Sequence, residues 1–410
     1  MIIRKAVIPL SHKWLLREGK LWVEKSIITH EQYEEIIKLY PESPRRISQI
    51  LPILASILIG LSLLTFVASN WDGIPQITRL AILTVTMISF YTSGYTLYKK
   101  GHQWLGQGLL SLGVVSFGAS MILVGQMFHL VAYDARVFVL WALAGLGLLY
   151  LYRKPVFFLL ASVLIFSGQI YSFSSFSTIS WTLLLLTGIG LGKFAYQDVN
   201  PLSGWVLSIL LHIQAVLLII SRDIAWSWVA FVPLGLYAIG MFLRRKPIAQ
   251  GFLVLPTIFS FFFSMLMVFI HEHVYDSAEF ITSPFAYFIG FIAVLLVVLW
   301  QGHGNKGKWL PLILFLPFFF LTHGDVAYLI SMFVFSAILI FYGDHQYDAV
   351  TARIGVFLFM LSSFIGYIQL AWDFLDKSFF FLIGGLLLFS IHWILKKRRL
   401  WMTKGEDKDK

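Results

Sequence analysis

The chain has 410 residues, of which 58% are hydrophobic and 13% are charged, and its formal net charge is +10. Soluble proteins average about 45–50% apolar and about 25% charged residues, so this composition excludes an ordinary soluble enzyme, a disordered chain and a fibrous protein. The lack of cysteine excludes disulfides, thiolate metal sites and cysteine nucleophiles. No basic, aromatic-rich surface motif accompanies the positive charge, so we expect no nucleic acid partner.

The N-terminal 46 residues are charged and precede the first long apolar run, so a cleavable signal peptide is not expected. Two short helices are predicted within residues 11–40. Thr29 and Gln32 have the spacing of a capping box, with Thr29 as the N-cap. We expect this head to lie on the membrane surface or on cytoplasmic loops, either as an amphipathic anchor or as an element that docks a partner or gates the protein.

Residues 47–395 predict a polytopic bundle of transmembrane helices, because apolar runs of about 20 residues recur along them. The fold class expected is therefore all-α, with about fourteen spans. The expected spans are 48–68, 76–98, 104–125, 136–152, 155–171, 178–196, 202–220, 224–243, 248–270, 282–300, 309–322, 325–342, 350–372 and 377–395. The span at 309–322 is short and contains Pro311 and Pro317, so it is either an unwound or re-entrant segment or a helix with a proline kink.

The distribution of positive charge predicts the orientation of these spans. With the N-terminus inside, only Arg79, Arg136, Arg222 and Lys377 of the 31 Lys and Arg residues fall outside. Because cytoplasmic loops are enriched in Lys and Arg, both termini are expected in the cytoplasm, with residues 396–410 as a basic and charged tail. The net charge of +10 is then explained by topology and contact with anionic lipid.

Three stretches together carry a family resemblance. They are a helical lead with Trp22, Ile27 and Gln32, the sequence VASNWDGIP at 67–75, and GQMFHL at 125–130 followed by Trp141. In this combination the chain resembles an uncharacterised bacterial membrane-protein family, domain of unknown function 2157, over residues 11–150. The resemblance implies a bacterial polytopic membrane protein and supplies no activity, cofactor or catalytic residues.

One candidate binding site lies at the predicted outer ends of the first and third spans. Asn70, Trp71 and Asp72 end the first span, and Gln126 and His129 end the third. These side chains supply hydrogen-bond donors and acceptors, an aromatic face and a carboxylate–imidazole pair able to exchange a proton. The alternative is a helix-capping turn beside an interfacial histidine.

A second set of polar residues lies within the spans and is listed as Gln107, Gln169, His212, Gln214, Gln369 and His392. Intramembrane polar groups usually face the bundle interior, where they either line a path or bond a neighbouring helix. His212 and Gln214 lie about ten residues into their span and are the best midplane candidates for substrate binding.

A third cluster follows the span at 248–270 and comprises His271, Glu272, His273, Asp276 and Glu279. Its composition suits a metal, with His323 or Asp325 as a further ligand, but its spacing is not the helical His-Glu-x-x-His pattern. We expect a solvated acidic loop, with no resident metal and no cofactor. The alternative is a structural metal site or proton sensing, for which His271 and His273 would suit an extended segment.

Three functions are consistent with this pattern. A transporter or lipid-type flippase is favoured, because the chain has many spans, little soluble domain and scattered polar groups within the membrane. A sensor or scaffold that signals through its N-terminal helices is the first alternative. A membrane enzyme acting on a lipid-linked substrate is the second, with Asp72 and His129 as its nominated pair. Membrane lipids and a small-molecule or lipid-linked substrate are the partners expected.

Overall fold

The computed structural model describes residues 12–39, 75–275, 284–301, 306–346 and 348–371, with scattered positions between 51 and 65 and between 382 and 393. These described residues form helices and contain no strand, which confirms the all-helical prediction. The chain divides into two compact units, Met1–Leu130 and Val131–Lys410. Each is described by itself.

The first unit begins with a helical hairpin formed by α1 (His12–Glu24) and α2 (His30–Leu39). The predicted capping box is present: Gln32 N donates to Thr29 Oγ1 at 3.2 Å, and Thr29 N donates to Gln32 Oε1 at 3.0 Å. The ring of Tyr33 packs where Gly19 leaves space, since a Cβ at Gly19 would lie 2.5 Å from it. Local capping and one aromatic contact therefore fix the hairpin.

A second hairpin in this unit joins α4 (Gln76–Lys99) to α5 (Gln103–Met127). Gln76 Nε2 donates to the carbonyl of Met127 at 3.2 Å, so the start of α4 lies beside the end of α5. Many residues of α5 are buried, whereas Leu83 and Gly94 are the buried residues of α4. The described residues thus leave most of the apolar surface of α4 uncovered, as expected for a helix that faces lipid.

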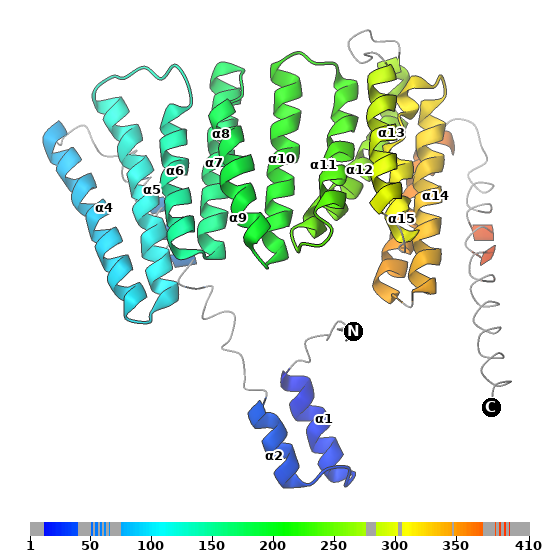
Figure 1. The fold of residues 1–410 in the computed structure, drawn as a ribbon, viewed down its shortest axis with the longest axis horizontal. Helices are drawn as coiled ribbons and strands as arrows, with labels where there is room; N and C mark the ends of the chain where they lie inside the picture. Colours follow the sequence, from blue (N-terminus) through cyan, green and yellow to red (C-terminus); the bar gives the residue numbers. More distant parts are fainter. Residues whose placement is uncertain are drawn as a thin grey trace. The chain divides into compact units, whose positions relative to one another are not determined.

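The second unit contains the remaining helices. Figure 1 shows that the helices from α6 to α11 lie alongside one another in chain order. Its elements are α6 (Arg136–Tyr152), α7 (Pro155–Phe176), α8 (Trp181–Leu185), η1 (Leu186–Leu191), α9 (Gly192–Gln197), α10 (Pro201–Ser221), η2 (Trp226–Ala230), α11 (Phe231–Phe242), α12 (Ala249–Tyr275), α13 (Pro284–Gln301), η3 (Lys306–Phe315), η4 (Phe318–Phe320), α14 (Gly324–His345) and α15 (Ala349–Ala371).

Proline residues and a polar N-cap determine where α7 and α10 begin. Pro155 and Pro201 occupy the first turns of α7 and α10, where no backbone N–H is needed. Asn200 caps α10 by accepting the N–H of Leu202 at 3.0 Å. The local sequence therefore favours these helix boundaries.

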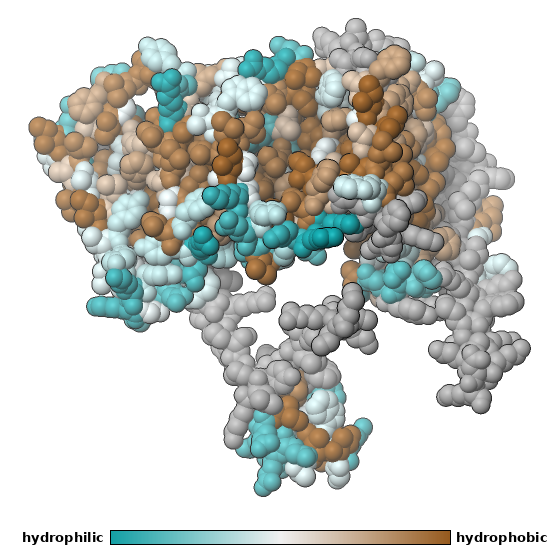
Figure 2. Space-filling model, viewed as in Figure 1, coloured by the Kyte–Doolittle hydropathy of each residue, from teal (hydrophilic) through white to brown (hydrophobic). Residues whose placement is uncertain are grey.

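One end of this unit gathers basic side chains, and we call it the basic end. Arg153 and Lys154 lie between α6 and α7, Lys193 lies in α9, residues 244–246 lie between α11 and α12, and Arg353 lies near the start of α15. Figure 1 shows these helix ends on the same side of the unit. The Lys246 amine lies 4.7 Å from the ring centroid of Tyr196, so the turn after α11 contacts the end of α9. Figure 2 shows hydrophobic side chains along the middle of these helices and hydrophilic ones gathered near this end. This pattern is typical of a membrane-embedded bundle.

Seven described helices are long and apolar enough to cross a membrane. They are Gln76–Lys99, Gln103–Met127, Pro155–Phe176, Pro201–Ser221, Ala249–Tyr275, Gly324–His345 and Ala349–Gln369. Four shorter apolar helices are Arg136–Tyr152, Trp226–Phe242, Phe285–Trp300 and Leu310–Phe320. The predicted spans 48–68 and 377–395 lie largely outside the described residues. Helical structure occurs at each of the remaining twelve predicted spans.

Three of the predicted spans contain turns that are not α-helical. The span expected at 178–196 contains the π-helical turn η1 between α8 and α9, and the span at 224–243 begins with the 3₁₀ turn η2. The segment with Pro311 and Pro317 forms the 3₁₀ turns η3 and η4. Tyr287 Oη donates to the carbonyl of Phe315 at 2.9 Å, so a buried side chain satisfies backbone that the interruption leaves unpaired.

Candidate functional site

The residues predicted at the outer ends of the first and third spans are described only in part. Asn70, Trp71 and Asp72 lie outside the described residues. Gln126 and His129 are both exposed at the end of α5, where the N–H of His129 donates to the carbonyl of Gln126 at 3.2 Å. His129 has a positive φ of 50° and so ends the helix. This part of the predicted site is an exposed helix terminus.

The predictions of a solvated loop and of an extended segment at His271 and His273 are wrong. α12 continues to Tyr275, and His271 is only 1% exposed within it. Because the two histidines are two residues apart on a helix, their rings point in different directions. Asp276 and Glu279 lie outside the described residues.

The His271 ring instead packs against Gly324, where a Cβ would lie 2.3 Å from His271 Nε2. The described residues contain no group of three or more side chains able to hold a metal ion.

The two midplane candidates are both buried in α10, with His212 2% and Gln214 1% exposed. The structure places them on different faces of the helix. His212 stacks on Phe259 of α12, with ring centroids 4.3 Å apart and planes 13° apart. Gln214 instead reaches η1, where its Nε2 donates to Thr187 Oγ1 at 2.8 Å. They therefore form two neighbouring polar contacts, and the structure does not bring them together in one cavity.

The contact of Gln214 involves the interrupted helix directly. Thr187 is fully buried in η1, and its hydroxyl donates in turn to the carbonyl of Leu183 at 2.9 Å. The amide, the hydroxyl and the carbonyl thus form a chain of two hydrogen bonds from α10 into α8. A π-helical turn places one extra residue in the helix, and such turns are frequent at functional sites.

Three buried polar atoms of α10 have no hydrogen-bond partner in the part of the chain that the structure describes. They are Ser208 Oγ, His212 Nε2 and Gln214 Oε1. His212 Nδ1 lies 2.7 Å from the carbonyl of Ser208, which can only accept, so Nδ1 carries the proton and Nε2 is an acceptor. Leaving a buried polar atom unpaired costs about 1–3 kcal/mol, so water or a ligand is expected to satisfy such atoms. Gln214 Oε1 and His212 Nε2, on different faces of α10, can each accept a hydrogen bond, whereas the Ser208 hydroxyl can donate or accept one.

Among the other polar residues within the predicted spans, Gln169 has a structural role. Gln169 is fully buried in α7 and clamps Ser180, donating to its carbonyl at 3.1 Å and accepting its N–H at 2.9 Å. Gln107 is buried in α5, Gln369 is half-buried in α15, and His392 lies outside the described residues. Gln169 therefore serves to hold the start of α8 against α7.

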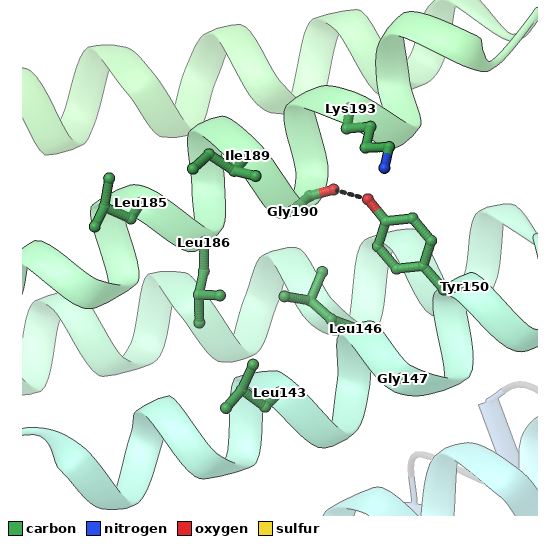
Figure 3. Close-up of a pocket in the computed structure, with 9 residues that line it drawn as sticks. All are labelled: Leu143, Leu146, Gly147, Tyr150, Leu185, Leu186, Ile189, Gly190 and Lys193. Atoms are coloured by element: carbon green, nitrogen blue, oxygen red, sulfur yellow. Dashed lines mark hydrogen bonds between the residues drawn. The ribbon is translucent and has the colours of Figure 1, made fainter.

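A groove on the outer side of the same interrupted helix was not predicted from the sequence. It encloses about 440 Å³ between α6 and the α8–η1–α9 segment. Figure 3 shows its lining residues, with the hydroxyl of Tyr150 donating to the carbonyl of Gly190, a bond of 2.7 Å. The lining comprises Leu143, Leu146, Gly147, Tyr150, Leu185, Leu186, Ile189, Gly190 and Lys193. The alternating glycines 188, 190 and 192 were the sequence signal for this irregular helix.

Comparison with known proteins supports the family resemblance. Residues 20–158 match the family described as predicted membrane protein (DUF2157). This match confirms the resemblance seen at Trp22, in the 67–75 stretch and at Trp141. No curated protein and no solved structure matches the chain.

Proposed function

We propose that this protein is a transporter of the lipid-flippase type in the bacterial cell membrane, with its basic end and both termini in the cytoplasm. The observation that carries the proposal is an interrupted helix, α8–η1–α9, packed against the buried Gln214 of α10, whose Oε1 has no hydrogen-bond partner among the described residues. Interior polar groups in membrane bundles mark substrate paths, and interrupted helices supply polar groups there.

The polar chain between α10 and η1 is the proposed moving part. Gln214 holds Thr187, so a shift of α10 breaks or remakes the bond that anchors the π-helical turn. Gln214 Oε1, an acceptor without a hydrogen-bond partner in the described part of the chain, suits a donor such as water or the hydroxyl or ammonium group of a lipid head. Asn70, Trp71, Asp72, Gln126 and His129 are proposed to meet the headgroup at the outer face.

The test is lipid movement across a bilayer. The purified full chain is reconstituted into phosphatidylcholine vesicles with a fluorescent phosphatidylglycerol in both leaflets, and dithionite bleaches the outer leaflet. Protein-free vesicles lose about half of the signal, and we expect vesicles with the protein to lose nearly all of it. Thr187→Val should slow this loss about tenfold, because tenfold corresponds to about 1.4 kcal/mol, within the cost of one lost buried hydrogen bond.

The matched control is Ser336→Ala, which removes a fully buried hydroxyl bonded within its own helix to the carbonyl of Met332. It should leave the rate unchanged. Wild-type vesicles that bleach only as far as protein-free ones would refute lipid transport. Equal slowing by both substitutions would refute the role of Thr187.

A sensor or scaffold function has one supporting observation, the separately capped hairpin of α1 and α2. Under that hypothesis, a strain producing the chain without residues 1–40 should behave like one lacking the whole protein, although the shortened chain still inserts in the membrane. Under the transport hypothesis, the shortened chain should still move lipid in vesicles. The two functions are thus separated by one deletion.

A further inference from the structure

The groove between α6 and α8–η1–α9 has apolar walls and one charged end. Leu143 and Leu146 lie on the α6 side, and Leu185 and Ile189 lie on the opposite side. Leu185 and Ile189 are largely exposed, as are parts of α6, so the groove opens outward from the bundle. A volume of about 440 Å³ lies within the usual range of small-molecule sites, about 300–1,000 Å³.

Local sequence keeps this groove open. Nothing lies within 4 Å of the position that a Cβ would take at Gly147, so that glycine borders empty space. A Cβ at Gly190 would lie 3.0 Å from Leu146, so glycine is also needed where the two walls approach. The bond from Tyr150 to the Gly190 carbonyl ties the walls together at one end (Figure 3). The groove is therefore a fixed feature of this irregular helix.

The positive charge at one end of the groove indicates which kind of molecule binds there. Lys193 is exposed at the basic end of the groove, and none of the lining side chains is acidic. Arg153 directly follows the last residue of α6, three residues after Tyr150, and adds a second positive charge near this end. In a bilayer, the apolar length faces acyl chains and the lysine amine reaches the headgroup layer, where it pairs with phosphate.

We propose that this groove holds one acyl chain of an anionic phospholipid, whose phosphate pairs with Lys193. The bound lipid lies on the outward side of η1, whereas the proposed transport path involves the inward contact of Thr187. The site therefore stands on different residues from the proposed function, and it holds whether or not the protein moves lipid.

The proposal is tested with the full chain in phosphatidylcholine vesicles that contain phosphatidylglycerol with a photoreactive acyl chain. We expect cross-links to peptides containing Leu143, Leu146 or Ile189, displaced by unlabelled phosphatidylglycerol more effectively than by phosphatidylcholine. Lys193→Gln should reduce this preference about fivefold, the factor expected for one lysine near an anionic lipid surface. Lys246→Gln removes the same charge at the same end, outside the groove, and should preserve the preference.

Filling the groove provides a second test. Gly147→Leu should abolish the cross-links, whereas Gly235→Leu, at another glycine with no atom within 4 Å of its Cβ position, should keep them. If Gly147→Leu does not fold, the comparison of the two lysine variants decides alone. Equal effects of both lysine variants would show diffuse surface charge and overturn the proposal. Cross-links missing from the groove in the wild type, because another helix or a second copy covers it, would also overturn it.

Discussion

The clamp formed by Gln169 permits a direct test of how α8 is held. Replacing Gln169 with Leu keeps the volume of a fully buried side chain and removes both of its bonds to Ser180. Each unpaired backbone group costs about 1–3 kcal/mol, although hydrogen bonds inside membranes contribute as little as about 0.6 kcal/mol. We therefore expect Gln169→Leu to reduce the free energy of unfolding by about 1–4 kcal/mol.

The assay is thermal unfolding of the detergent-purified protein, with the folded fraction followed by size-exclusion chromatography after heating. Gln107→Leu is the matched control, because this buried glutamine makes no side-chain hydrogen bond among the described residues. Gln169→Leu should lower the midpoint clearly more than the control. Equal midpoints for the two variants would refute the argument that the clamp stabilises the start of α8.

Three further predictions concern other contacts. Gly251→Ala should cost about 1–3 kcal/mol in the same unfolding assay, because its Cβ would lie 2.3 Å from the backbone of Gly204; no loss would refute this close helix contact. The hydrogen bond from the Thr351 hydroxyl lowers the pKa of the Asp348 carboxyl below its ordinary value. The stabilisation from this hydrogen bond is therefore present above the unfolded-state pKa of Asp348 and is lost as the pH falls through its folded-state pKa. Below about pH 4, the thermal unfolding midpoint of the wild type should therefore decrease more steeply with falling pH than that of Asp348→Asn. Parallel curves of midpoint against pH would contradict this. Thr29→Ala should speed amide exchange in the first turn of α2 several-fold, whereas Thr29→Ser should not, since loss of an N-cap costs about 0.5–2 kcal/mol.

Some features of the site were within reach of the sequence although they were not predicted. Residues two apart on a helix differ by about 200° in direction, so His212 and Gln214 had to face different neighbours. The same geometry separates His271 from His273 once α12 is known to continue through them. The prediction of a loop at His271 was wrong because the charged and polar residues that follow an apolar run were interpreted as the end of the helix.

The sequence alone determined the features that depend on local chemistry and on solvent. Runs of apolar residues fixed where helices lie, Pro155 and Pro201 fixed two helix starts, and Thr29 with Gln32 fixed the cap of α2. Tertiary structure alone decided that Thr187 faces inward to Gln214, that His271 is buried against Gly324, and that a groove opens between α6 and η1. The reason is physical: hydrocarbon accepts any apolar face equally, so hydropathy sets the spans, whereas the partner of each polar group depends on which helices pack together.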